Sequence, residues 1–184
     1  MEHDWIVCDT LYDLADCIEI KKTCVKNIDE NIIDGPAHNT VKTSEVKLLN
    51  YRHVKDALEP AHEFVLHINK NYFGLDIHNV CDGDVVLLNT YDSKNKASYE
   101  WHKDVAATTQ LFDFKLTMLI NLSDGNYEGG NLQIFTTGGE QTIDSFKQPG
   151  AVCIIPSWVP HRVTNVTSGV RTTLSYFYTG PKIR

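Results

Sequence analysis

The sequence predicts a mainly β fold with α-helices at its N-terminal end. Residues 9–26 and 51–73 carry apolar side chains at the spacing of a helix face, whereas short β-rich runs separated by turn signals dominate from residue 85 onward. Many short strands at regular spacing are typical of a β-sandwich or a barrel. The chain has 184 residues, which fits one domain with a substantial core.

The first predicted helix occupies residues 9–26, with Thr10 as a candidate cap. Residues 27–43 follow as a long segment rich in Asn, Asp, Gly and Pro, which predicts a loop. Loops of this length are often functional lids, and they are also found as plain surface excursions. Both interpretations stay open for this segment.

The second predicted helix occupies residues 51–73, where the apolar stripe is more regular. Asn50 is its candidate cap, and Gly74 is a stop signal. Pro60 lies inside this helix, so we expect a kink there or a break between two shorter helices.

The rest of the chain alternates between strand and turn signals. Val, Ile, Leu, Phe, Tyr and Thr fill the runs, and Gly, Asn, Asp, Ser and Pro separate them. The predicted strands before the last hairpin are residues 44–50, 85–91, 99–102, 114–122, 132–136, 141–146 and 151–155.

The last predicted element is a β-hairpin with arms at residues 161–165 and 171–178, separated by a Thr-Ser-Gly turn signal. Strand side chains alternate between faces, so His161 and Arg171 would share a face if Asn165 lay opposite Arg171. They would then be separated by about four residues, or roughly 13 Å. That distance suits a metal held by histidine, a short dicarboxylate, and an arginine that clamps its far end.

The segment Tyr99-Glu-Trp-His102-Lys-Asp104 contains the only His-x-Asp of the chain. In an extended segment both side chains project to the same side. Two histidines and one carboxylate that leave three coordination positions open form the facial triad of non-haem Fe(II) oxygenases. His102 could instead be an ordinary strand-end residue, and His161 a buried histidine bonded to the backbone. The ordered occurrence of these residues with Arg171 favours the metal site.

At these positions the sequence resembles the Fe(II)- and 2-oxoglutarate-dependent oxygenases, and within them the prolyl 4-hydroxylase-like group. The matching motifs are Tyr91, Tyr99-x-x-His102-x-Asp104, Leu122-Ser-Asp, Tyr127-Glu-Gly-Gly130-Asn-Leu132, His161-Arg-Val and Arg171-x-Thr173. The resemblance implies a double-stranded β-helix core (a jelly roll, cupin-like) over residues 81–184. Residues 1–80 would be a helical support region, and the whole chain, 1–184, a single dioxygenase domain.

The resemblance also implies roles for individual residues. The implied catalytic metal ligands are His102, Asp104 and His161. The residues implied to bind 2-oxoglutarate are Arg171, Thr173 and Tyr91. The residues implied on the substrate side are Tyr99 and Trp158. Asn121 stands where many prolyl hydroxylases carry a tyrosine that supports the co-substrate, and no role is assigned to it. The Gly pair of the Glu128-Gly-Gly130 motif is expected to allow a close-packed backbone beside the site.

The implied activity is hydroxylation of a C–H bond, in prolyl residues of a protein or peptide, with release of succinate and CO2. The implied cofactors are Fe(II), the co-substrate 2-oxoglutarate, O2, and ascorbate as reductant. The same chemistry on a free amino acid or another small metabolite is an alternative. A jelly-roll module that holds a metal without turnover is another, and the intact triad with Arg171 argues against it.

Composition limits the partners and the compartment. The net charge of −7 disfavours non-specific binding to nucleic acid, which rests mainly on Lys and Arg. The odd number of five cysteines, without a C-x-x-C pair, argues against a disulfide framework. The sequence shows neither a signal-peptide pattern at its start nor an apolar run long enough to cross a bilayer. We therefore expect a cytoplasmic protein without a membrane partner.

Overall fold

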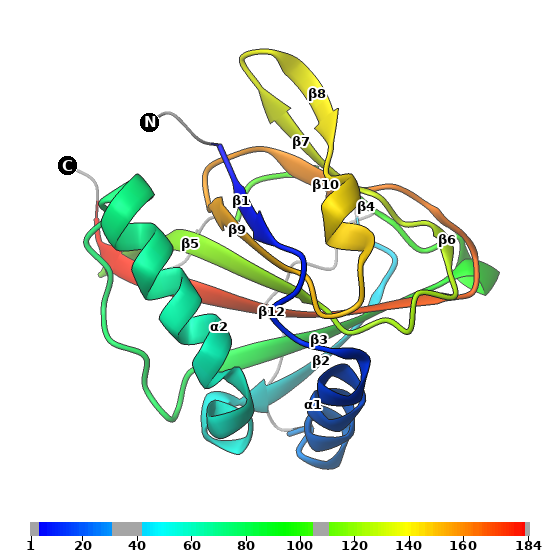
Figure 1. Ribbon diagram of the computed structural model, residues 1–184, viewed down its shortest axis with the longest axis horizontal. Helices are drawn as coiled ribbons and strands as arrows, with labels where there is room; N and C mark the ends of the chain where they lie inside the picture. Colours follow the sequence, from blue (N-terminus) through cyan, green and yellow to red (C-terminus); the bar gives the residue numbers. More distant parts are fainter. Residues whose placement is uncertain (1–3, 31–41, 105–110, 183–184) are drawn as a thin grey trace.

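The computed structural model of the protein describes residues 4–30, 42–104 and 111–182. Two antiparallel sheets lie face to face, and two helices cover the outer face of the larger sheet (Figure 1). One core fills the space between these helices and the larger sheet, and a second core lies between the sheets. This architecture confirms the predicted mainly β fold with N-terminal helices and a double-stranded β-helix core.

The larger sheet has six strands. In spatial order they are β1 (Ile6–Cys8), β9 (Val152–Pro156), β5 (Phe112–Asn121), β12 (Val170–Pro181), β3 (Val85–Asp92) and β2 (Glu45–Asn50). β12 is central, and its side chains alternate between the two faces. Leu174 and Tyr176 pack in the core beneath the helices, so Arg171 and Thr173 point toward the other sheet.

The smaller sheet has four strands and carries both predicted histidine ligands. In spatial order they are β4 (Tyr99–His102), β10 (His161–Val163), β7 (Leu132–Thr136) and β8 (Gly139–Thr142). The β7–β8 hairpin projects from the body of the protein (Figure 1). A separate two-stranded sheet joins β11 (Val166–Ser168) to β6 (Glu128–Gly129).

The predicted hairpin of residues 161–165 and 171–178 is wrong. β10 pairs with β4 and β7, whereas β12 pairs with β3 and β5, so the two segments belong to opposite sheets. Between them the chain pairs with β6 and then crosses through Gly169. Gly169 has φ of +71°, and a Cβ there would overlap the carbonyl oxygen of Asn126. The Thr-Ser-Gly signal therefore marks a crossing between sheets.

Helix α1 (Leu14–Lys26) begins later than predicted. Asp13, rather than Thr10, is the N-cap, and its carboxylate accepts a hydrogen bond from the backbone N–H of Asp16 (2.9 Å). The Asp16 carboxylate accepts the Asp13 N–H in return (3.1 Å). This capping box satisfies two donors that the first turn leaves free, which fixes the start of the helix.

The second predicted helix forms as a continuous series of turns. A 3₁₀ turn (Tyr51–His53), helix α2 (Lys55–Ile68) and a π-helical turn (Asn69–Phe73) follow one another. The series ends at Gly74 in the left-handed conformation, as predicted, whereas Asn50 makes no capping bond with its side chain.

Pro60 lies inside α2 and does not divide it into two helices. The hydroxyl of Tyr12 accepts a hydrogen bond from the N–H of Ala61 (3.2 Å) and donates to the carbonyl of Ala57 (3.0 Å). An undistorted helix would join these two backbone groups directly. A side chain inserted into the helical ladder therefore compensates for the distortion that proline introduces.

The predicted strands 44–50, 85–91, 99–102, 114–122, 132–136 and 151–155 agree with the structure within about two residues, whereas β6 and β11 were not predicted. β1 was not predicted either, and residues 141–146 are not one strand, because β8 ends at Thr142 and a 3₁₀ turn (Asp144–Lys147) follows. β1 and β2 also show that residues 1–80 are not purely helical. No helix within the described ranges is long and apolar enough to span a membrane.

Candidate functional site

The three predicted metal ligands come together on the inner side of the smaller sheet. His102 and His161 are direct cross-strand partners on β4 and β10, with ring centroids 4.2 Å apart. Asp104 follows β4, and its N–H donates to the carbonyl of Ser157 (2.9 Å). Its Oδ1 lies 3.6 Å from Nε2 of His102, and its Oδ2 lies 3.3 Å from Nε2 of His161. The three side chains thus offer ligand atoms within 4.8 Å of one another.

Hydrogen bonds on the far side of each ring orient the two imidazoles. Nδ1 of His102 contacts the carbonyl of Glu100 (2.7 Å), and Nδ1 of His161 contacts the carbonyl of Val159 (3.0 Å). A carbonyl only accepts, so each Nδ1 carries the hydrogen, and in the neutral ring Nε2 presents a lone pair. Two such lone pairs and a carboxylate converge here, and this donor set fits Fe(II).

Burial and mutual charge set the protonation of the three groups. Burial lowers the pKa of His102 to about 4, and the charge of His161 adds to this effect. Burial alone would raise the pKa of Asp104, but the charges of His161 and His102 and the hydrogen bonds from His161 and Thr117 together outweigh it, and the pKa is lowered. Burial likewise opposes a charged His161, yet Asp104 raises its pKa. Asp104 is therefore held as a carboxylate, ready to bind a cation.

Two further residues contact Asp104 and were missed in the sequence. The hydroxyl of Thr117 on β5 donates to Oδ2 of Asp104 (2.8 Å) and lies 3.0 Å from the hydroxyl of Ser157. No motif marks these residues. The alternation of β5 could have placed Thr117 on an inner face, but not beside Asp104, because that contact depends on how the two sheets stack.

Arg171 is 2% exposed, and on β12 it lies opposite Tyr91 of β3. Its guanidinium lies 5.0 Å from the ring centroid of Tyr91 and 5.7 Å from that of Phe146. Its Nη1 is buried without a hydrogen-bond partner, and no carboxylate of residues 4–30, 42–104 and 111–182 forms an ion pair with it. A buried charge in this state needs an anion, so the position fits a carboxylate of a ligand.

The pKa of Tyr91 is affected by the charges of both Arg171 and the metal ligand Asp104. Burial raises the pKa of the Tyr91 phenol, the charge of Arg171 opposes this, and the charge of Asp104 adds to it. Thr173 is buried on the same face as Arg171, between Asn89 and Asn121 of the neighbouring strands. The residues predicted to bind 2-oxoglutarate thus line one inner face of the larger sheet.

Asn121 holds the turn after β8. Its side-chain amide donates to the carbonyl oxygens of Phe146, Lys147 and Gln148 at 3.1, 3.0 and 3.2 Å. Phe146 in turn covers the guanidinium of Arg171. Asn121, which stands where many prolyl hydroxylases carry a tyrosine, therefore has a structural role here.

The two residues predicted on the substrate side lie in different surroundings. The ring of Tyr99 stacks on that of His102, with centroids 3.4 Å apart. Nζ of Lys42 lies 4.7 Å from the Tyr99 ring centroid and donates to Oδ1 of Asn89 (2.9 Å). Trp158 packs against the core between the sheets.

The predicted loop 27–43 contacts residues 92–98 at its described C-terminal end. The N–H of Thr43 donates to the carbonyl of Ser98 (3.0 Å), and the N–H of Ser98 donates to the Thr43 hydroxyl (2.9 Å). Residues 31–41 lie outside the described residues, so a lid role for 27–43 stays a prediction.

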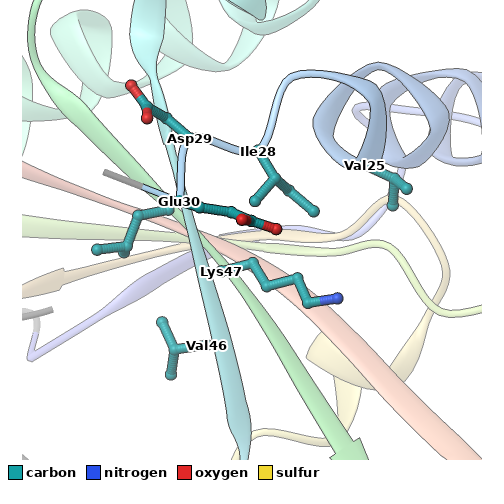
Figure 2. Close-up of a pocket in the computed structure, with 7 residues that line it drawn as sticks. Val25, Ile28, Asp29, Glu30, Val46 and Lys47 are labelled. Atoms are coloured by element: carbon teal, nitrogen blue, oxygen red, sulfur yellow. The ribbon is translucent and has the colours of Figure 1, made fainter. Parts of the chain in front are cut away.

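A separate cavity of about 530 Å³ lies between the end of α1 and β2 (Figure 2). Its lining residues are Val25, Ile28, Asp29, Glu30, Val46, Lys47 and Leu48. None of them belongs to the metal-ligand set or to the surroundings of Arg171, so the cavity is distinct from the candidate site.

The fold and the triad define a class: double-stranded β-helix oxygenases with a non-haem iron centre. The family model for the 2OG-Fe(II) oxygenase superfamily matches residues 86–179, and the chain belongs to this superfamily. Its members use Fe(II), 2-oxoglutarate and O2, in agreement with the predicted cofactors.

Relatives and solved structures add detail. The chain is 41% identical over 75 residues to a PKHD-type hydroxylase of Synechococcus sp. strain CC9605, a match covering 40% of this chain and 33% of the relative. A second PKHD-type hydroxylase, from strain CC9311, is 37% identical over 81 residues, or 44% of this chain and 36% of the relative. The chain thus spans about a third of the length of the curated relatives it matches.

Two solved structures share the fold. A prolyl-4-hydroxylase from Pseudomonas putida has a TM-score of 0.71 at 17% identity, covering 99% of this chain and 95% of that one. A viral collagen prolyl hydroxylase from Paramecium bursaria Chlorella virus-1, solved with 2-oxoglutarate, also has a TM-score of 0.71, at 14% identity and 97% coverage of both chains. These likenesses establish a prolyl-hydroxylase-like fold.

Proposed function

We propose that the protein is a hydroxylase that acts on prolyl residues of a protein or peptide and releases succinate and CO2. The observation that carries this proposal is the buried His102, Asp104 and His161 set, together with a buried Arg171 whose Nη1 has no hydrogen-bond partner. Membership of the oxygenase superfamily supports the chemistry. The prolyl target is supported by the neighbours, which include a prolyl hydroxylase from Trichoplax adhaerens in complex with a hypoxia inducible factor peptide (TM-score 0.71, 12% identity).

In this proposal the metal is held by Nε2 of His102, Nε2 of His161 and the Asp104 carboxylate. When bound, Fe(II) supplies the oxidation of 2-oxoglutarate and of the substrate C–H bond by O2. The carbonyls of Glu100 and Val159 keep both rings in the tautomer that binds a metal. The chain's own work is to hold these ligands rigidly and to keep the site dry.

Arg171 binds the distal carboxylate of 2-oxoglutarate through its planar fork. The hydroxyls of Tyr91 and Thr173 line the same inner face and add donors beside it. Because Arg171 is enclosed by the Tyr91 and Phe146 rings, its pair with the carboxylate is shielded from water and is strengthened by the low local dielectric. This anchors one end of the co-substrate and directs the other end toward the metal.

Tyr99 and Trp158 are proposed to border the substrate. The proposed role of Tyr99 is supported by the stacking of its ring on the metal ligand His102. The proposed role of Trp158 is supported by its position between Ser157 and Val159, whose carbonyls accept hydrogen bonds from the metal-ligand residues Asp104 and His161. We also propose that residues 1–184 act as a single dioxygenase domain, with the β-helix core in 81–184.

The test is mass spectrometry of lysate peptides after incubation with the protein, Fe(II), 2-oxoglutarate and ascorbate. We expect the gain of one oxygen atom on prolyl residues, formation of succinate, and loss of both with His161→Ala. Oxygen gained on another residue or on a small metabolite would keep the chemistry and overturn the prolyl target. Metal binding without succinate from any sample would instead favour the non-catalytic module.

A further inference from the structure

The two oxygens of the Asp104 carboxylate lie in different surroundings. Oδ2 accepts a hydrogen bond from the hydroxyl of Thr117 (2.8 Å) and lies 3.3 Å from Nε2 of His161. Oδ1 faces Nε2 of His102 at 3.6 Å, and no hydroxyl or amide in the described part of the chain donates to it. The carboxylate is therefore held asymmetrically before any metal is bound.

The direction of these hydrogen bonds follows from their chemistry. An ionised carboxylate only accepts, so the single hydroxyl proton of Thr117 points to Asp104. The hydroxyl of Ser157, 3.0 Å away, must then donate to Thr117. Ser157 also accepts the N–H of Asp104 at its own carbonyl (2.9 Å). Thr117 and Ser157, 1% and 0% exposed, thus hold Asp104 by backbone and side chain in a buried network.

We propose that Thr117, supported by Ser157, is a positioning residue that engages Oδ2 and leaves Oδ1 as the oxygen that binds the metal. This inference rests on the proposed function, because it concerns the same iron site. A metal with octahedral preference and three protein ligand atoms keeps three open positions. If 2-oxoglutarate chelates the metal, it would take two of them and leave the third for O2. A carboxylate that bound through both oxygens would remove one of these positions.

Thr172 provides a matched control. It is also a buried threonine of the larger sheet, 1% exposed, but its hydroxyl has no hydrogen-bond partner among the described residues. It alternates with Arg171 and Thr173 on β12 and so lies on the opposite face of the sheet. Replacement by valine removes the same hydroxyl from the same kind of environment without a contact to Asp104.

The experiment compares Thr117→Val, Thr117→Ser and Thr172→Val with the wild type. Without oxygen, we measure 2-oxoglutarate affinity for the Mn(II)-loaded proteins, and the visible charge-transfer absorption of the Fe(II)–2-oxoglutarate complex. Outer partners of metal ligands typically contribute about 10- to 100-fold. We therefore expect at least about a tenfold loss of 2-oxoglutarate affinity and an altered absorption band for Thr117→Val. Thr117→Ser should recover most of the loss, and Thr172→Val should match the wild type.

A Thr117→Val protein that equals Thr172→Val in both measurements overturns the inference. So does a crystal structure of the Mn(II)-loaded wild type with Oδ2, or both oxygens, on the metal. Should Thr117→Val not fold, Ser157→Ala replaces it: a loss in the same direction supports the inference, and an unchanged affinity contradicts it. Failure of the wild type to bind Mn(II) and 2-oxoglutarate would reject the proposed function itself, which separates the two.

Discussion

Arg171 places a full positive charge in the space between the sheets, and its Nη1 has no hydrogen-bond partner. An arrangement of this kind is costly for the free protein, because a buried charge loses its hydration and the surrounding protein replaces it only in part. The aromatic rings of Tyr91 and Phe146 offset only part of this cost. In the proposed function, binding of a dianion such as 2-oxoglutarate would recover the remaining cost.

Replacement of Arg171 by alanine should therefore weaken 2-oxoglutarate binding and leave metal binding nearly intact. Removing one member of a buried charge pair costs about 2–5 kcal/mol. This corresponds to roughly a thirty-fold or larger increase in Kd at about 1.4 kcal/mol per decade. Arg171→Lys should fall between, because it keeps the charge and loses the fork. Calorimetric titration of the Mn(II)-loaded protein measures the effect.

Arg162→Ala is the control for this change. Arg162 lies next to His161 in sequence, but its side chain pairs with Glu140 (3.1 Å) and Gln133 (2.7 Å). Its loss should leave the 2-oxoglutarate Kd unchanged. An Arg171→Ala protein that is folded and binds 2-oxoglutarate as tightly as Arg162→Ala would remove Arg171 from the site.

The residues of the site differ in how far the sequence could predict them. His102 and Asp104 were recognisable because two positions along one extended segment fix their common direction. His161 and Arg171 were recognised by motif, but the distance between them was derived from a hairpin that does not exist. Thr117 was out of reach, because its contact with Asp104 depends on how the two sheets stack and not on a local pattern.

At the scale of single elements, α2 depends on a side chain from outside the helix. The hydroxyl of Tyr12 accepts a hydrogen bond from the N–H of Ala61, the residue after Pro60, and donates one to the carbonyl of Ala57. Tyr12→Phe keeps the ring and removes this link, leaving a buried N–H without a partner. We expect a loss of about 1–3 kcal/mol in the free energy of unfolding, measured by urea denaturation.

Pro60→Ala supplies the control for Tyr12. Without proline, the helix can close its own backbone hydrogen bonds, so the cost of Tyr12→Phe should shrink in the Pro60→Ala background. Equal costs in both backgrounds would mean that the hydroxyl does not compensate for the proline.

His62 on α2 links helix packing to pH. Its Nδ1 lies 3.0 Å from the hydroxyl of Tyr178, whose pKa burial raises far above the usual range, so the phenol stays neutral beside the imidazole. Burial lowers the pKa of His62 below its ordinary value of 6.5. The unfolded chain then binds a proton at higher pH than the folded protein, and stability falls as pH drops below that value.

His62→Gln keeps an acceptor and removes the titration. The wild type should lose more stability than His62→Gln between about pH 7.5 and about pH 5.5, because other titrating groups contribute equally to both proteins. Urea unfolding at the two pH values measures this difference. Parallel pH dependence in the two proteins would contradict the assignment.

The strands illustrate which elements local patterns can specify. β4 and β7 have the predicted bounds, since alternation and turn residues are properties of a few neighbouring positions. The sheet to which each strand belongs is not such a property. The segments 161–165 and 171–178 have strand character on both sides of a turn signal, yet Gly169 directs them into different sheets.

For the molecule as a whole, Gly169 is the point where the chain leaves the smaller sheet region for the larger sheet. Gly169→Ala would add a side chain both at a positive φ and against the carbonyl of Asn126. Gly139, the first residue of β8, has φ of +95° but no atom within 4 Å of an added Cβ. Gly139→Ala thus isolates the conformational cost, about 1–2 kcal/mol.

We expect Gly169→Ala to lower the free energy of unfolding by at least about 1 kcal/mol more than Gly139→Ala does, because overpacking adds to the strain. Thermal or urea unfolding of both variants measures the difference. Identical losses would show that the backbone at Gly169 moves away from the Asn126 carbonyl without cost. The close contact between these two residues would then not contribute to stability.

The two halves of the candidate site belong to opposite sheets. His161 and His102 come from the smaller sheet, and Arg171 and Tyr91 from the larger. A co-substrate held at one end by Arg171 and at the other by the metal would tie the sheets together as a removable crosslink. Its binding free energy would then count toward resistance to unfolding, about 2.7 kcal/mol at a hundredfold excess over Kd. The melting temperature would consequently follow the supply of 2-oxoglutarate, and a protein deprived of it would be the form most exposed to proteases.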